Sequence, residues 1–358
     1  MRILTALLLL FWLPWSQAQG FIGETTCKPS AKKTQVVKKI TAKPTKAAGK
    51  KSATSKSGST ARSKATPTRN ARPLAKGRQA TPRKLARQQR RNIVVASPAP
   101  VVIDPSRPPA LQSHAALVMR HDTGEVLYAK NANEPHPIAS VTKLMSAIVV
   151  LDQNLALEEL VRVSEEDVDT LKNSSSRLPV GTALSREELL MLALMSSENR
   201  ATSALARTSV PGGLPRFVAA MNRKAQSLGM QDSRFRDPTG LNPGNVSTAA
   251  DLAKLAQAAY QYPLIRRITT TPEGEVYFSN RFLPTEYRNT NSLVRNQTMA
   301  IGLSKTGYIR EAGRCLVMQA NLADDPYLLI FLGSSARSGP AQDALRLERW
   351  LNHRRLGG

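Results

Sequence analysis

The chain has 358 residues and a formal net charge of +25, and its length fits either one or two domains. Residues 21–100 contain 21 lysines and arginines and one acid, Glu24, whereas the 29 basic and 25 acidic residues of 101–358 leave a net charge of only +4. A nearly neutral folded part lacks the basic surface typical of nucleic-acid-binding domains, so no nucleic acid is expected as a partner.

The first residues have the pattern of a secretory signal. A short charged start, Met1-Arg2-Ile3, leads into an apolar run over 4–15, and Ser16-Gln17-Ala18 follows as a small-x-small exit. We predict a cleavable signal peptide over 1–18 and a periplasmic protein that can associate with the cell wall or membrane surface. An uncleaved anchor is the alternative, but a membrane span needs about 18 or more apolar residues.

Residues 19–109 are predicted to be a disordered tail, because lysine, alanine, threonine and proline dominate and too little apolar surface is present to offset the entropy of ordering. The tail is either a cationic tether for anionic polymers of the cell envelope or a solvated spacer. It contains Cys27, and the other cysteine is Cys315. An oxidising compartment would permit a bridge between them, but two unrelated thiols are the simpler expectation.

The globular domain is predicted over 110–358, with strands near both of its ends and helices between them. This order predicts an α+β fold in which helices flank an antiparallel sheet and an all-helical lobe is inserted. Ser185 and Glu188 form a capping box before an apolar helix over 189–195. We predict strands at 115–120, 125–131, 299–305, 314–321 and 327–332, and further helices from Ser140, at 200–207, 214–228, 248–260 and around Trp350.

The segment Ser140-Val141-Thr142-Lys143 is a Ser-x-x-Lys motif. On a helix this spacing places the hydroxyl and the amine on one face, so a lysine with a depressed pKa can take the serine proton. The motif alone has little specificity, because Ser30-Ala31-Lys32-Lys33 in the tail also matches it.

Two companion motifs supply the specificity. Ser197-Glu198-Asn199 lies in a predicted junction between helices, and Lys305-Thr306-Gly307, followed by Tyr308, ends a predicted strand. Taken singly, a serine or asparagine at a helix start can be a cap, and a lysine can belong to an edge strand. Those interpretations do not explain the three motifs together.

The three motifs resemble those of the active-site serine penicillin-recognising enzymes, which include the low-mass penicillin-binding D-alanyl-D-alanine peptidases and the class A β-lactamases. The resemblance covers 111–358 and implies an acyl-enzyme mechanism on peptidoglycan cross-link peptides, with β-lactam antibiotics as covalent inhibitors. It implies that Ser140 attacks the D-alanyl carbonyl and that Lys143 accepts its proton. Ser197 would relay a proton to the leaving amine, and Asn199 would hold the acyl side of the substrate.

The Lys-Thr-Gly motif would complete this site. The resemblance implies that the charge of Lys305 helps to keep Lys143 neutral and that Lys305 and Thr306 bind the carboxylate beside the scissile bond. The oxyanion would lie between the backbone N–H groups of Ser140 and Tyr308, where preorganised donors lower the barrier. Gly307 would keep the strand edge open to an incoming backbone.

Within this resemblance, a β-lactamase is disfavoured because no glutamate occurs between Glu198 and Glu273 to activate a deacylating water. The segment 236–241 instead resembles the Thr-Gly-Leu turn of the D-alanyl-D-alanine peptidases. Roughly 50 residues follow the Lys-Thr-Gly, so we do not expect the extra C-terminal domain and anchor of common carboxypeptidases. The arrangement is similar to the penicillin-binding protein 7/8 endopeptidases, although Glu198 stands where they usually have aspartate. A carboxypeptidase on the same site is the alternative.

Functions of other classes have weaker support. A non-enzymatic polyanion binder built on the tail would bind with steep salt dependence and without Ser140. The four histidines have no Gly-x-Ser-x-Gly partner for a serine–histidine triad, and no His-Glu-x-x-His is present for zinc. No cofactor and no metal are expected.

Overall fold

The computed structural model describes residues 107–278 and 282–356. The predicted signal peptide and the tail up to residue 106, including Cys27, lie outside the described residues. Among the helices that are described, none combines the length and the hydropathy that a membrane crossing requires.

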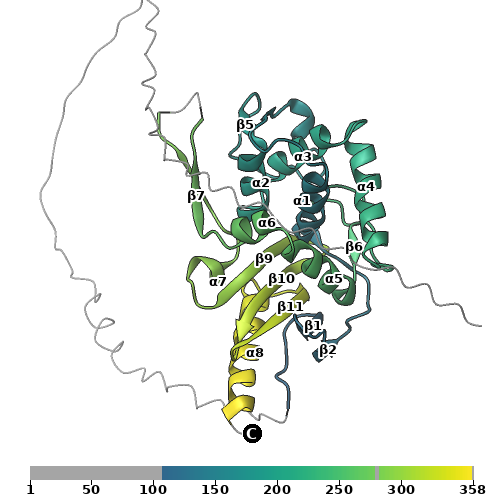
Figure 1. Ribbon diagram of the computed structural model, residues 1–358, viewed down its shortest axis with the longest axis vertical. Coiled ribbons are helices and arrows are strands. Elements are labelled where there is room, and N and C mark those ends of the chain that lie inside the picture. The colour runs from purple at the N-terminus through teal and green to yellow at the C-terminus, as the bar shows by residue number, and fades with distance from the viewer. Residues whose placement is uncertain (1–106, 279–281, 357–358) are drawn as a thin grey trace, which may run out of the picture. The chain divides into compact units, whose positions relative to one another are not determined.

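A five-stranded sheet forms the base of the domain, with the strand order β2-β1-β11-β10-β9 and antiparallel pairing throughout. Strands from the two ends of the domain therefore lie side by side, as predicted (Figure 1). Because β9 is paired only with β10 in this sheet, its other edge is available to a peptide backbone. The strands are β1 (Ala115–Arg120), β2 (Val126–Lys130), β9 (Ala300–Ile309), β10 (Gly313–Leu322) and β11 (Asp325–Ser334).

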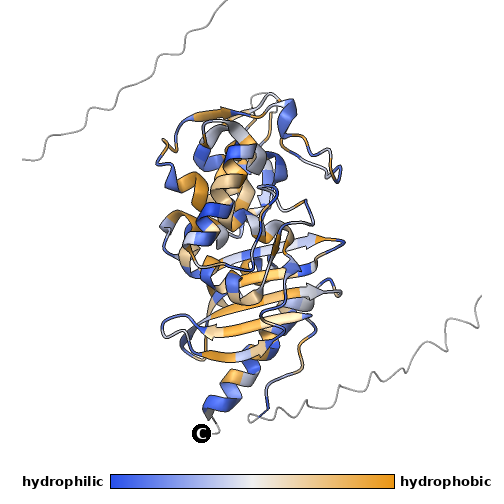
Figure 2. Ribbon diagram, turned by 90° about the vertical axis from the view of Figure 1, so that its right-hand side faces the viewer, coloured by the Kyte–Doolittle hydropathy of each residue, from blue (hydrophilic) through white to orange (hydrophobic). Residues whose placement is uncertain are grey.

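Side chains of the central strands alternate between two separate hydrophobic cores, because successive residues of a strand point to opposite faces. Val317 and Ile330 belong to the core beneath the helical lobe. Leu316 and Phe331 belong to the core that α8 (Gly339–Leu356) covers with Trp350. The central strands are apolar on both faces, which is visible as orange arrows in Figure 2.

The inserted lobe is built around α1 (Thr142–Asp152), whose residues are buried from Thr142 to Val150. This helix is buried on every side because α2, α3, α4 and α5 all pack against it. The other helices of the insertion are α2 (Arg186–Met195), α3 (Asn199–Ser209), α4 (Gly213–Ser227), α5 (Ala249–Tyr260), α6 (Pro263–Thr269) and α7 (Ser292–Arg295).

Most of the predicted elements are present. The capping box is formed, with Ser185 Oγ accepting from the Glu188 N–H and the Glu188 carboxylate accepting from the Ser185 N–H. Two strands are longer than predicted: the strand that carries the Lys-Thr-Gly continues to Ile309, and the strand predicted at 327–332 begins at Asp325 and ends at Ser334.

Helices α6 and α7 and several short strand pairs were not predicted, because they bury too few side chains to show a period. The most prominent is the hairpin of β7 (Glu273–Val276) and β8 (Thr285–Arg288), whose two strands bury only Val276 and Tyr287 among their own residues. The other pairs join β3 (His136–Pro137) with β6 (Val246–Ser247), and β4 (Leu160–Arg162) with β5 (Ala183–Ser185).

A buried carboxylate ties the beginning of the domain to its last helix. Asp343 on α8 is fully buried. Its oxygens accept from the backbone N–H groups of Gln112 and Ser113 and from the Ser113 hydroxyl, at 2.7 to 2.9 Å. Arg346 lies 2.8 Å from the same carboxylate but is about one-third exposed. These hydrogen bonds fix the point where the chain enters β1.

We expect Asp343→Ala to lower the free energy of unfolding by about 3 kcal/mol, because the substitution leaves buried N–H groups without an acceptor. Arg346→Ala is the control and should cost at most about 1 kcal/mol, as for a partly exposed ion pair. Urea unfolding followed by circular dichroism measures both. Equal losses in the two variants would refute the anchoring role of the Asp343 hydrogen bonds.

Candidate active site

The structure brings the three motifs together from three parts of the fold. Ser140 lies in a short 3-10 turn, Ala139–Val141, that leads directly into α1. Ser197 and Asn199 lie at the junction of α2 and α3. Lys305 lies on β9, the edge strand next to the 3-10 turn. The site therefore forms where the sheet edge meets the helical lobe.

The backbone around Ser140 is held by close approach of two glycines. A Cβ atom at Gly240 would lie 2.0 Å from the carbonyl oxygen of Ala139 and 2.8 Å from the Ser140 nitrogen. A Cβ atom at Gly307 would lie 3.1 Å from the same nitrogen. Ala139 itself has a φ of +48°, which an alanine adopts at a cost of about 1 kcal/mol or more. Backbone therefore packs directly on backbone at this serine.

Lys143 is the centre of the hydrogen-bond network and is almost completely buried. Its Nζ lies 2.9 Å from Ser140 Oγ, 2.7 Å from Asn199 Oδ1 and 2.6 Å from the carbonyl oxygen of Thr239. The last two atoms can only accept hydrogen bonds, whereas a hydroxyl can also donate. In the neutral amine, two N–H groups are thus directed to Asn199 and Thr239, and the lone pair faces the Ser140 hydroxyl.

Burial is also what makes the neutral amine accessible. It lowers the pKa of Lys143 from its ordinary 10.5 to about 7, although the charges of Asp237 and Glu198 act in the opposite direction. Burial was one of the two causes of a depressed lysine pKa that were considered from the sequence, and it is the principal one here. Repulsion between the amines is expressed at Lys305, whose pKa is lowered first by burial and second by the charge of Lys143.

Lys305 and Ser197 form the second part of the network. Lys305 Nζ lies 3.0 Å from Ser197 Oγ, and the lysine is 1% exposed, so it is not a solvated edge-strand lysine. Ser197 has a φ of +63°, a left-handed conformation that is uncommon for serine. Strain of this kind is retained where the surroundings fix a side chain, here the hydroxyl beside Lys305.

Neither Ser140 nor Asn199 is a helix cap. Val141 occupies the N-cap position of α1, and Glu198 occupies that of α3. Both ends of the Asn199 side-chain amide are hydrogen-bonded instead. Its Oδ1 accepts from Lys143, and its Nδ2 donates to Ser174 Oγ at 3.0 Å. Ser174 belongs to a loop that the sequence analysis did not select.

The turn that presents the Thr239 carbonyl depends on Asp237, which lies in the segment 236–241 singled out in the sequence, and on Asn245, which was not singled out. Asn245 is fully buried, accepts from the Arg236 and Asp237 N–H groups and donates to Thr142 Oγ1 on α1. The Asp237 carboxylate accepts from the N–H groups of Thr239 and Gly240. Aspartate and asparagine around Pro-Thr-Gly are a turn signal, but the sequence does not indicate that the turn faces Lys143.

Thr306 and Gly307 line a groove together with residues of β10 and the start of α8. Thr306 Oγ1 lies 2.6 Å from Thr290 Oγ1, a residue not singled out in the sequence. Tyr308 is 55% exposed, and its ring is covered by the Arg314 guanidinium at 3.9 Å. Three arginines border this groove, namely Arg295, Arg314 and Arg337.

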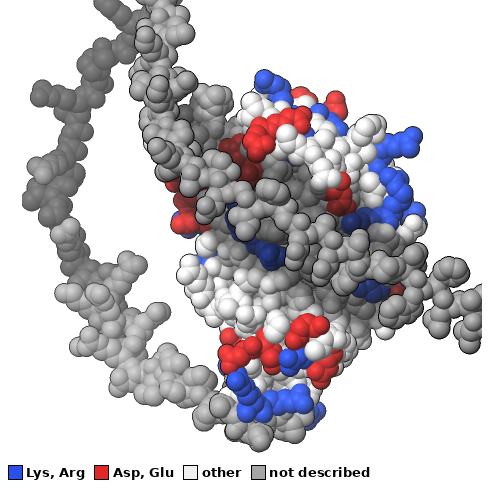
Figure 3. Space-filling view, in the orientation of Figure 1, with Lys and Arg blue, Asp and Glu red and all other residues white. Residues whose placement is uncertain are grey.

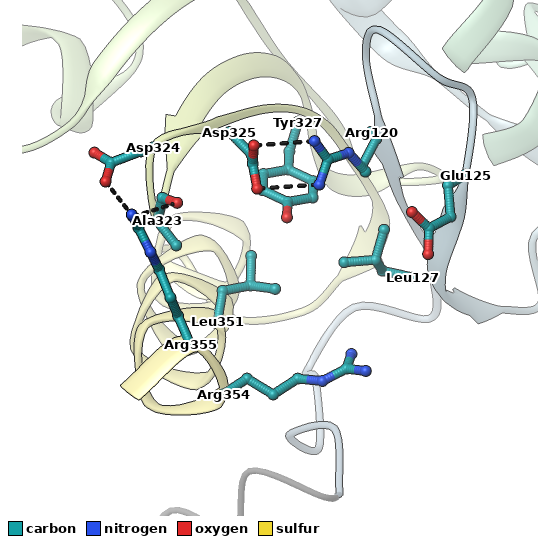
Figure 4. Close-up of a pocket in the computed structure, with 10 residues that line it drawn as sticks. All are labelled: Arg120, Glu125, Leu127, Ala323, Asp324, Asp325, Tyr327, Leu351, Arg354 and Arg355. Carbon is teal, nitrogen blue, oxygen red and sulfur yellow. Dashed lines mark hydrogen bonds and ion pairs between the residues drawn. The ribbon is translucent and has the colours of Figure 1, made fainter. Parts of the chain in front are cut away.

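A second pocket lies apart from these residues, between the β10–β11 turn and the end of α8 (Figure 4). Arg120 donates to both oxygens of Asp325 there, and Leu127 and Leu351 form an apolar floor. No predicted site residue lines it. In the described part of the chain, no group of three or more histidine, cysteine, aspartate or glutamate side chains is arranged to hold a metal ion.

Comparison with protein families gives a match over residues 103–336 to the peptidase S11 family, described as D-alanyl-D-alanine carboxypeptidase. The chain belongs to this family. The matched range contains the three motifs and ends just before α8. The resemblance drawn from the motifs is therefore confirmed.

Several S11 relatives are named as endopeptidases. The chain is 46% identical to a D-alanyl-D-alanine endopeptidase of Pseudomonas aeruginosa, with 72% of this chain and 83% of the relative aligned. It is 43% identical to a D-alanyl-D-alanine endopeptidase of Escherichia coli, over 68% of this chain and 78% of the relative. Other relatives, such as one in Bacillus subtilis at 32% identity over 63% of this chain and 58% of the relative, are named as carboxypeptidases.

The fold of the family is also found among solved structures. The crystal structure of the Streptomyces K15 DD-transpeptidase superposes with a TM-score of 0.64 at 28% identity, covering 68% of this chain and 98% of that one. The predicted α+β fold with flanking helices and an inserted lobe is confirmed.

Cys315 is a buried free thiol, and burial raises its pKa to about 12.

We expect Gly240→Ala to destabilise the domain more than Gly181→Ala. The two glycines have φ values of +86° and +85°, so both variants incur a strain of about 1 kcal/mol or more. Only at position 240 does the new methyl group meet backbone, which adds about 1 to 3 kcal/mol, whereas nothing lies within 4 Å at 181. Thermal unfolding measures the difference, and equal melting temperatures would contradict the backbone contact at Ser140.

Proposed function

We propose that the protein is a serine D-alanyl-D-alanine endopeptidase that cleaves peptidoglycan cross-link peptides through an acyl-enzyme on Ser140. The observation that carries this proposal is the buried Lys143 amine, which lies 2.9 Å from Ser140 Oγ while its other two partners can only accept hydrogen bonds. A neutral lysine in this setting is a general base directed at one hydroxyl.

In the first step Ser140 Oγ attacks the D-alanyl carbonyl carbon and its proton passes to Lys143. The developing oxyanion would be stabilised by the backbone N–H groups of Ser140 and Tyr308, worth on the order of 3 kcal/mol each. The close packing of Gly240 and Gly307 on the backbone next to Ser140 supports this role, because it keeps the Ser140 N–H in place.

The leaving amine must receive a proton before it departs, and this proton comes from a group other than Lys143. Ser197 Oγ, 3.0 Å from Lys305 Nζ, is placed to deliver it. The carboxylate beside the scissile bond would bind at Thr306 and Lys305, next to the groove with Arg295, Arg314 and Arg337. An anion there would favour the charged form of Lys305, whose pKa is depressed by burial.

Two reactions can use this machinery, namely endopeptidase cleavage of cross-links and carboxypeptidase removal of a terminal D-alanine. The endopeptidase is the main proposal because the relatives at 46% and 43% identity carry that name. Action on peptidoglycan places the protein outside the cytoplasm, and we propose the periplasm, reached through the signal peptide predicted over 1–18. β-Lactams are proposed to acylate Ser140.

The wild-type protein should convert cross-linked muropeptide dimers into monomers. Ser140→Ala should release no monomer and take up no fluorescent penicillin, because the nucleophile is gone. Ser30→Ala changes the serine of the other Ser-x-x-Lys and should behave as wild type. Chromatography of the digests and gel fluorescence measure the two outcomes. Release of D-alanine without monomers would favour the carboxypeptidase, and labelling of Ser140→Ala would refute the mechanism.

Acylation should depend on pH through Lys143. Below a pH of about 7 the amine is protonated and cannot take the Ser140 proton, so the rate should fall about tenfold for each further pH unit. Above that pH the rate should reach a plateau. Stopped-flow acylation by a chromogenic cephalosporin measures the profile. The rate is measured in buffers from about pH 5.5 to about pH 8. A rate that stays constant over this range would exclude Lys143 as a base with this pKa.

A further inference from the structure

The groove beside Thr306 carries positive charge that no acidic side chain balances. It has a volume of about 560 Å³ and is bordered by Arg295 on α7, Arg314 on β10 and Arg337 after β11. None of the described residues that line the groove is an aspartate or a glutamate. The three arginines also form no ion pair with any other residue that the structure describes. A groove of this kind attracts an anionic ligand.

Two of these arginines are held in position by uncharged partners. Arg295 Nη1 donates to the backbone carbonyl of Asn289. The Arg314 guanidinium lies 3.9 Å from the centre of the Tyr308 ring. Because a guanidinium has five N–H donors, both side chains keep donors for a ligand. Their charges are therefore preorganised, which lowers the entropic cost of binding an anion.

The groove begins where the proposed mechanism places the leaving group. Thr306 lines the groove, and in that mechanism it binds the carboxylate beside the scissile bond together with Lys305. A carboxypeptidase releases a single D-alanine, which has no other carboxylate. Pockets of about 300 to 1,000 Å³ accommodate ligands much larger than one amino acid. The groove thus offers more space and more positive charge than a leaving D-alanine can use.

An endopeptidase has a larger leaving group than a carboxypeptidase. The amine that is released from a cross-link belongs to a second stem peptide, which ends in a C-terminal carboxylate of its own. The side chain of the cross-linking residue and one further residue separate this carboxylate from the one beside the scissile bond, a span of about 10 Å when extended. Arginine is the side chain best suited to bind such a group, because two parallel N–H groups can donate to one carboxylate.

We propose that Arg295 and Arg314 form a subsite for the C-terminal carboxylate of the leaving stem peptide. The two guanidinium groups come from different elements, α7 and β10, and bind this carboxylate through charge-assisted hydrogen bonds. Because Lys305 and Thr306 bind the carboxylate beside the scissile bond, the subsite acts only on a leaving group with a second carboxylate. This inference rests on the proposed function and assigns the residues that favour a cross-link over a terminal D-alanine.

The test uses two cross-linked muropeptide dimers that differ only at the C-terminal carboxylate of the leaving stem, which is either free or amidated. The full chain is compared with Arg295→Gln and Arg314→Gln. Arg216→Gln is the control, because Arg216 is an exposed arginine of α4. This helix lies on the side of the lobe away from α7 (Figure 1), where lysines and arginines also gather (Figure 3). Fluorescent penicillin titration counts the intact sites in each preparation, and kcat/KM is measured for each dimer.

Wild type and Arg216→Gln should cleave the dimer with the free carboxylate about tenfold faster than the amidated dimer. Arg295→Gln and Arg314→Gln should each reduce this preference to about threefold or less and cleave the amidated dimer at the wild-type rate. Equal cleavage of the two dimers by wild type would overturn the subsite while the proposed function stands, and so would equal slowing of both dimers by the two variants. If wild type cleaves neither dimer, the proposed function itself fails.

Discussion

The hydrogen bonds of the Lys143 amine are the constraint on which the rest of the site depends. A lysine that is almost fully buried must either lose its proton or find acceptors, and here it has three potential partners within 2.9 Å. Only the Ser140 hydroxyl among them can return a hydrogen bond. Desolvation and hydrogen bonding therefore act together. Burial lowers the pKa of the amine, so that its neutral form is populated near neutral pH, and the two acceptors fix the direction of its lone pair.

Each partner of Lys143 comes from a different segment of the chain. The serine is on the turn before α1, the asparagine is at the start of α3, and the Thr239 carbonyl is on a turn held by Asn245. Lys305 reaches the same place from the sheet edge. The strained φ angles at Ala139 and Ser197 occur at this meeting point, where packing from both sides can maintain them.

Much of this could be predicted from the sequence, and the parts that could not share a physical cause. Strands such as β10 and β11 alternate between two cores, so their apolar runs identify them, whereas β7 and β8 bury too little to show a period. Ser140, Ser197 and Lys305 could be identified because their hydroxyl and amine groups belong to side chains, which the sequence names directly. The Thr239 carbonyl was not, because every residue has a backbone carbonyl and only the fold decides which one faces an amine.

The contact between Gly240 and the backbone at Ser140 has a consequence for how the domain can change. Since main chain rests on main chain there, the nucleophile is positioned without the help of a variable side chain. Substitutions in the surrounding core would alter the stability of the lobe but leave this contact as it is. The side chains of the surrounding core can therefore change during evolution, while the neighbouring backbone contact continues to fix the position of the nucleophile.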